Sequence, residues 1–149
     1  MYEHHEKAHK DIEKNGCHIV YEHGTASFPP LAYSIGIEKT TKFPDLIVTG
    51  MDKDTAHFLI NEYLYRIKDG EKFEPGKFYE DFLEDAKITF KAIDKKFYKS
   101  RFSHALWYYE GDDFTMHHLI WPDHDGVYPW EKKATKEYRA LMPPLYARK

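Results

Sequence analysis

An amphipathic segment that directly follows a continuous apolar run limits the folds open to this chain. Residues 45–49 contain an unbroken Leu-Ile-Val run, which is typical of a buried strand. Asp52 or Asp54 can cap a helix after it, and Gly70 can end that helix. Between these ends, apolar residues recur at helical spacing, at positions 56, 59, 60, 63, 64 and 67. We therefore expect a surface helix packed on a buried strand of a sheet.

The remaining periodic segments add strands and helices without strict alternation. Strands are expected over residues 17–22, 31–37, 86–93 and 114–121, and helices over residues 3–15 and 95–109. Residues 73–82 contain Pro-Gly and are expected to form an ordered loop. This order predicts an α+β fold. We expect about five mostly antiparallel strands, in one sheet or a partly open barrel, packed by two longer helices.

Length and composition fit a single domain over residues 1–149, with a polar N-terminal helix at 1–15 and a basic tail at 132–149. The 22 basic and 25 acidic side chains give a net charge of −3, which provides no strong signal for nucleic-acid binding. No run of 18 apolar residues occurs, so we expect no membrane association. The single cysteine, Cys17, favours a reducing, cytoplasmic compartment.

Three short motifs occur in a fixed order along the chain. They are Tyr-Ser-Ile-Gly at 33–36, Phe-Pro-Asp-Leu-Ile-Val at 43–48, and Trp-Pro-Asp at 121–123, followed by Gly126 and by Pro-Trp at 129–130. Together they resemble the bacterial family catalogued as domain of unknown function 4262, over residues 16–131. The resemblance implies one compact bacterial domain and no particular reaction. The chain departs from the expected family pattern at His118, where we expect Gln.

His118 and Asp123 form our candidate catalytic pair. His117 and His118 are neighbours on a strand and point to opposite faces, so one of them must approach the core or a pocket. We prefer His118 because it occupies the substituted position next to the Trp-Pro-Asp motif. An imidazole of ordinary pKa can act as acid or base, and the Asp123 carboxylate could orient it. A buried, neutral histidine is the alternative interpretation.

Two features could bind a metal, and we assign a metal site to neither. His5 and His9 match the H-E-x-x-H zinc motif, but their helix has little apolar surface to hold it in a core. Residues 104–125 combine histidines with acidic and aromatic side chains, and no Lys or Arg lies between Arg101 and Lys132. Such a surface suits a divalent cation or a planar cationic ligand, or else consists of two solvated turns. The residues identify no cofactor.

Aromatic residues make up 17% of the chain and suggest how a ligand is held. Tyr33, Trp121 and Trp130, with Ser34, are our candidate ligand-binding residues, although such rings can also simply fill a core. We therefore expect first a module whose aromatic, histidine-lined pocket binds a small planar ligand, for example a nucleotide-like one. A His/Asp hydrolase, with or without a metal, is the second hypothesis. A protein-interaction module, such as a homodimer, is the third. Whether the protein is an enzyme stays open.

Overall fold

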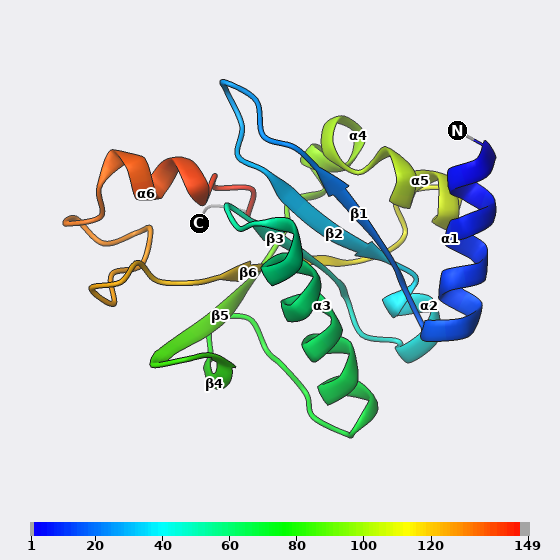
Figure 1. The fold of residues 1–149 in the computed structure, drawn as a ribbon, viewed down its shortest axis with the longest axis horizontal. Helices are drawn as coiled ribbons and strands as arrows, with labels where there is room; N and C mark the ends of the chain where they lie inside the picture. The colour runs from blue at the N-terminus through cyan, green and yellow to red at the C-terminus, as the bar shows by residue number, and fades with distance from the viewer. Residues whose placement is uncertain (1, 147–149) are drawn as a thin grey trace.

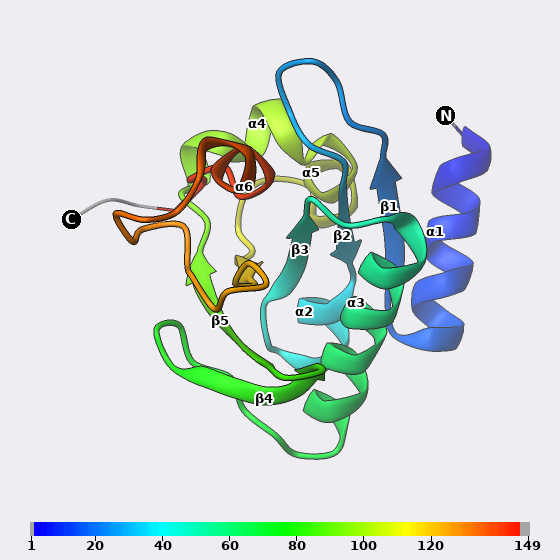
Figure 2. The ribbon, with the colours of Figure 1, turned by 60° about the vertical axis from the view of Figure 1, so that its left-hand side comes forward.

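One open mixed sheet of six strands forms the centre of the computed structural model, which describes residues 2–146, with side chains from residue 5 onward (Figures 1 and 2). The strands are β1 (His18–Glu22), β2 (Leu31–Ile35), β3 (Asp45–Thr49), β4 (Phe78–Leu83), β5 (Ala86–Ala92) and β6 (Met116–Ile120). Their order is β1-β2-β3-β6-β5-β4. Only β3 and β6 pair in parallel, and the other neighbours are antiparallel. The α+β class is confirmed, with six strands in a sheet and not a barrel.

Helices cover both faces of this sheet (Figure 1). The described residues form α1 (Tyr2–Asn15), α2 (Ile37–Thr41), α3 (Lys53–Lys68), a 3₁₀ turn η1 (Lys95–Phe97), α4 (Tyr98–Arg101), α5 (Ser103–Tyr109) and α6 (Lys136–Leu141). α3 packs on one face, and α1, α4 and α5 pack on the other. α6 packs near the end of β6. Within residues 2–146, no helix is both long and apolar enough to cross a bilayer.

The predicted amphipathic helix is confirmed as α3. Asp52 caps it, because its carboxylate accepts a hydrogen bond from the Thr55 backbone amide at 3.2 Å. All six predicted apolar positions are buried. They pack against a face of the sheet that includes Ala32, Leu46 and Val48. Fully burying a side chain as large as Leu or Ile contributes about 1.5–3 kcal/mol to stability. This stripe is therefore a major part of the core.

Two predicted elements were wrong. Residues 73–82 were expected to form a loop, but β4 begins at Phe78. β4 is an exposed edge strand whose register shifts between Tyr79 and Leu83, so it carries no clear alternation of its own. The long helix expected over residues 95–109 is broken at Phe102, whose φ of −125° and ψ of 48° are not helical. The break lets the fully buried Phe102 ring pack edge-to-face against Tyr33.

The C-terminal segment packs onto the sheet. α6 lies within the predicted basic tail, and the Asp94 amide donates to the Leu145 carbonyl at 2.9 Å. Ile93 also forms an antiparallel bridge with Tyr146. Residues 147–149 of the predicted tail lie outside the described residues.

Candidate functional site

The Tyr-Ser-Ile-Gly and Phe-Pro-Asp motifs meet at one buried carboxylate, that of Asp45. Its oxygens accept hydrogen bonds from four donors, which are the Ser34 hydroxyl at 2.7 Å, the Tyr109 hydroxyl, the Ile37 amide at 2.8 Å and the Glu38 amide at 3.3 Å. Burial raises the pKa of Asp45 to about 6, although these donors favour its ionised form. The carboxylate therefore joins β2, α2, β3 and the end of α5.

Ser34 and Tyr33, on neighbouring positions of β2, are both buried in the interior. Ser34 is fully buried and donates to Asp45, and its oxygen accepts from the Leu46 amide at 3.0 Å. Tyr33 is also fully buried, with its ring against Phe102. Neither side chain lines the pocket described below. Two of the four predicted ligand-binding residues thus lie in the interior and away from it.

His118 is fully buried beside Thr49. Its Nε2 lies 3.0 Å from the Thr49 hydroxyl, which itself donates to the Leu141 carbonyl at 2.7 Å. Because the hydroxyl has only one proton to donate, Nε2–H is the donor to it, and this assigns the tautomer. Burial lowers the pKa of His118 to about 3 and that of His117 to about 4. His118 is therefore neutral at physiological pH.

Asp123 lies beyond the end of β6 and organises a turn. Its Oδ1 accepts hydrogen bonds from the amides of Asp125 and Val127, each at 2.9 Å. The two candidate catalytic residues are not joined, because His118 Nε2 is bonded to Thr49, and Nδ1 has no hydrogen-bond partner in the described part of the chain. The orientation of His118 by Asp123 that the sequence suggested is absent from residues 2–146.

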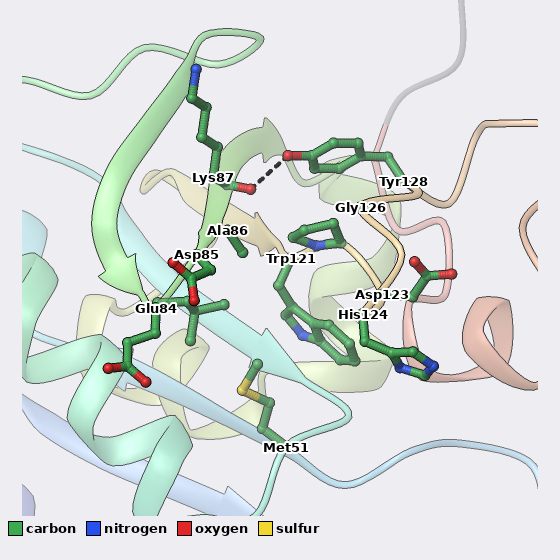
Figure 3. A pocket seen from close by; sticks show the side chains of 12 residues that line it. Met51, Glu84, Asp85, Ala86, Lys87, Trp121, Asp123, His124, Gly126 and Tyr128 are labelled. Carbon is green, nitrogen blue, oxygen red and sulfur yellow. Dashed lines mark hydrogen bonds between the residues drawn. The ribbon is translucent and has the colours of Figure 1, made fainter.

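The loop after β6 and the turn between β4 and β5 enclose a pocket of about 570 Å³ (Figure 3). Its lining residues are Met51, Leu83, Glu84, Asp85, Ala86, Lys87, Trp121, Pro122, Asp123, His124, Gly126 and Tyr128. All three residues of the Trp-Pro-Asp motif thus line a cavity. The β4–β5 side was missed, because this turn is far from the motif in sequence and its acidic residues look like an ordinary solvated turn.

The aromatic side chains at this pocket are held in place. Trp121 Nε1 donates to the Thr49 carbonyl at 2.9 Å, and its ring meets Tyr138 edge-to-face at 5.6 Å. The Tyr128 hydroxyl donates to the Lys87 carbonyl at 2.6 Å, as Figure 3 shows. Trp130 does not line the pocket itself but stacks on Tyr128 at 5.5 Å. The indole of Trp121 is therefore preorganised.

Carboxylates outnumber cations around the pocket. Glu84, Asp85 and Asp123 line it, whereas Lys87 is its single lysine. In Figure 3 the Lys87 ammonium points away from Trp121. Acidic residues therefore predominate in the lining, which favours a cation or a hydrogen-bond donor.

The structure does not bring together a set of metal ligands at either of the two features that suggested metal binding, among the residues that it describes. His5 stacks on Trp107 with a ring separation of 3.5 Å, and His9 meets the same indole edge-on at 5.1 Å. Among the residues that the structure describes, no three His, Cys, Asp or Glu side chains are grouped so that they could hold a metal ion.

The chain is similar to a known protein family. A family model described as Domain of unknown function (DUF4262) matches residues 11–135, which is most of the chain. No curated protein and no solved structure matches the sequence.

Proposed function

The chain belongs to the DUF4262 family, and we propose that it binds a small planar ligand in the pocket between the Trp-Pro-Asp loop and the β4–β5 turn. The observation that carries this proposal is the Trp121 indole, which lines a pocket of about 570 Å³ and is fixed by its bond to Thr49. This volume lies in the range of small-molecule sites, roughly 300–1,000 Å³. A fixed indole offers a flat face at little entropic cost.

The charges of the lining favour a ligand with a basic or donor-rich edge. Glu84, Asp85 and Asp123 would attract an amidine or a protonated heterocycle stacked on the indole. A phosphate group would meet these carboxylates, with the Lys87 ammonium turned away (Figure 3). We therefore favour a base or nucleoside over a nucleotide.

The proposal contains no chemical step. His118 is buried beside Thr49 and is not among the residues that line this pocket. A histidine whose pKa is lowered to about 3 is also a weak proton acceptor at neutral pH. Binding is the activity that the geometry supports best.

Two pairs of matched probes test the proposal by NMR. Benzamidine and benzoate share shape and differ in charge, and adenosine differs from its monophosphate by the phosphate. We expect benzamidine to shift the Trp121 indole N–H resonance and to bind at least about tenfold more tightly than benzoate, which corresponds to about 1.4 kcal/mol. Adenosine is expected to bind more tightly than its monophosphate.

The acidic turn supplies the variant, and a second acidic pair supplies its control. Glu84→Gln with Asp85→Asn removes two exposed charges, and Asn tolerates the positive φ of 55° at Asp85. This double variant should bind benzamidine and benzoate about equally. Asp112→Asn with Asp113→Asn, exposed on another turn, should keep the wild-type preference. If no probe shifts Trp121 at millimolar concentration, or if both double variants behave alike, the proposal is wrong.

A further inference from the structure

The two edges of the sheet differ in how they are protected. At one edge, the β4 register is interrupted between Tyr79 and Leu83, and Asp81 adopts a positive φ of 70°. Bulges and exposed charges of this kind prevent an edge strand from pairing with another chain. At the other edge, β1 keeps an uninterrupted register with β2 over all five residues. Within residues 2–146, β1 has no partner strand on its outer side.

A groove of about 490 Å³ runs along the free edge of β1. One wall comes from α1 and α5, including His5, Lys7 and Trp107. The other wall comes from the start of α3, with Lys53 and His57. Figures 1 and 2 both show α1 lying beside β1. The groove therefore has side-chain walls on both faces of the sheet and a strand edge between them.

The groove differs in charge from the Trp-Pro-Asp pocket. Its lining carries Lys7, Lys53 and five histidines, and Glu22 is its single carboxylate. Asp11, which lies nearby, is hydrogen-bonded to His18 Nδ1 at 2.7 Å and forms an ion pair with Lys7 at 3.4 Å, so the positive charge open to a ligand is that of Lys53. The lining thus presents donors and positive charge, which complement carboxylates.

We propose that the free edge of β1 binds an extended acidic peptide as a seventh strand of the sheet. Main-chain hydrogen bonds to the outer side of β1 would supply affinity, as in other cases of strand addition. Successive side chains of the peptide would point to alternate faces. Those on one face would meet Ile19, Tyr21 and Lys53, and those on the other would meet Val20, Lys7 and Trp107.

The walls favour a single peptide over a second copy of the sheet. A second copy would bring its own α1 and α3 against the same walls, so both pairs of helices would have to fit around two adjoining strands. An isolated strand has no such helices and fits between the walls. Carboxylates on one face of this strand would reach the exposed Lys53, whereas Lys7 on the other face already pairs with Asp11.

Three synthetic heptapeptides test the proposal. One alternates Val and Glu, one alternates Val and Lys, and the third is the Val/Glu peptide with an N-methyl group on every residue, which removes the main-chain donors from both edges of the peptide strand. We expect the Val/Glu peptide to shift the amide resonances of residues 18–22 and to slow their hydrogen exchange. The Val/Lys peptide should bind at least about tenfold more weakly, and the N-methylated peptide should not bind.

Matched charge reversals locate the site. Lys53→Glu should weaken binding of the Val/Glu peptide at least about threefold. The fold should be retained, because an acidic residue in the first turn of α3 interacts favourably with the helix dipole. Lys133→Glu, exposed in the segment before α6, should leave the affinity unchanged.

Other outcomes would overturn the proposal. They are the absence of shifts in β1 at millimolar Val/Glu peptide, equal binding of the N-methylated peptide, and equal effects of the two lysine variants. Sedimentation of the free chain as a dimer with residues 18–22 already protected from exchange would also overturn it, because a second copy would then occupy the edge.

Discussion

The imidazole of His118 is fully buried, and the Thr49 hydroxyl is its hydrogen-bond partner. Burial lowers its pKa to about 3 from an ordinary value of 6.5. The unfolded chain therefore binds a proton near pH 6.5, whereas the folded chain excludes it. Because the pKa is lowered on folding, the stabilising contribution is complete above pH 6.5 and is lost as the pH falls toward 3.

Replacing His118 by the Gln expected from the family resemblance should reduce this acid sensitivity. The amide of Gln can donate to Thr49 and does not titrate. We expect His118→Gln to lose stability more slowly than the wild type as the pH falls from 6.5 to 4, by up to about 1.4 kcal/mol per pH unit. Urea unfolding at a series of pH values measures the two slopes.

The exposed His124 provides the control for this comparison, because His124→Gln should leave the pH dependence unchanged. The buried carboxyl group of Asp45 changes the free energy of unfolding with pH in the opposite direction to His118. Its pKa is raised to about 6 by burial, so its contribution is lost as the pH rises from 3.8 to 6. This contribution is common to both proteins and cancels in the difference. Equal slopes for wild type and His118→Gln would contradict the buried, neutral state of the imidazole.

Strand alternation correctly indicated that either His117 or His118 points inward, but both are buried. The reason is the position of β6, which lies between β3 and β5 and has packed side chains on both faces. Alternation reports which residues share a face. It does not report whether one or both faces of the strand are covered.

The junction between β2 and α2 depends on the close approach of α1. Gly36 has a φ of 99°, and a Cβ atom there would lie 2.7 Å from Cγ1 of Ile12 in α1. The Gly36 amide also donates to the Tyr109 hydroxyl at 3.0 Å. A side chain at this position would both strain the backbone and push α1 away.

Gly36→Ala should therefore destabilise the protein by about 2–4 kcal/mol, of which roughly half comes from the left-handed backbone and the rest from the clash with Ile12. Gly70→Ala is the matched control, since Gly70 has a φ of 100° and a Cβ atom added there would have no neighbour within 4 Å. It should cost only about 1–2 kcal/mol. Urea unfolding gives both free energies, and equal losses would show that α1 does not press on Gly36.

The C-terminal segment covers part of the sheet, although it lies far from most of the strands in sequence. The Leu141 carbonyl accepts from the Thr49 hydroxyl, and Leu145 accepts from the Asp94 amide. Met142 and Leu145 are buried, and Met142 and Tyr138 pack near Ile120. This segment lies beyond residue 135, where the family match ends.

A chain shortened to end at Thr135 should lose about 3–5 kcal/mol of stability, because several buried apolar side chains are removed and Ile120 becomes exposed. Urea unfolding of the shortened and full chains measures the loss. The Trp121 indole resonance should also shift, since its ring contacts Tyr138 of α6. A shortened chain that unfolds at the same urea concentration would show that the segment adds nothing to the core.

The sequence by itself determined the elements whose pattern is local. The stripe of α3 and the apolar run of β3 were predictable because helix and strand periodicity depend on residues a few positions apart. The Trp-Pro-Asp motif was likewise recognisable from adjacent residues, and its three residues line a pocket. The exposed edge strand β4 was not, because its pattern does not alternate.

Only the tertiary structure decided which distant segments meet. The parallel pairing of β3 with β6 joins residues about 70 positions apart, and the Asp45–Tyr109 bond spans 64 positions. The pocket likewise joins the β4–β5 turn to the loop after β6. Such contacts depend on how the whole chain buries its apolar surface and pairs its polar groups, and no local spacing encodes them. For the same reason Tyr33 and Ser34 became part of the interior while Trp121 was left to line a pocket.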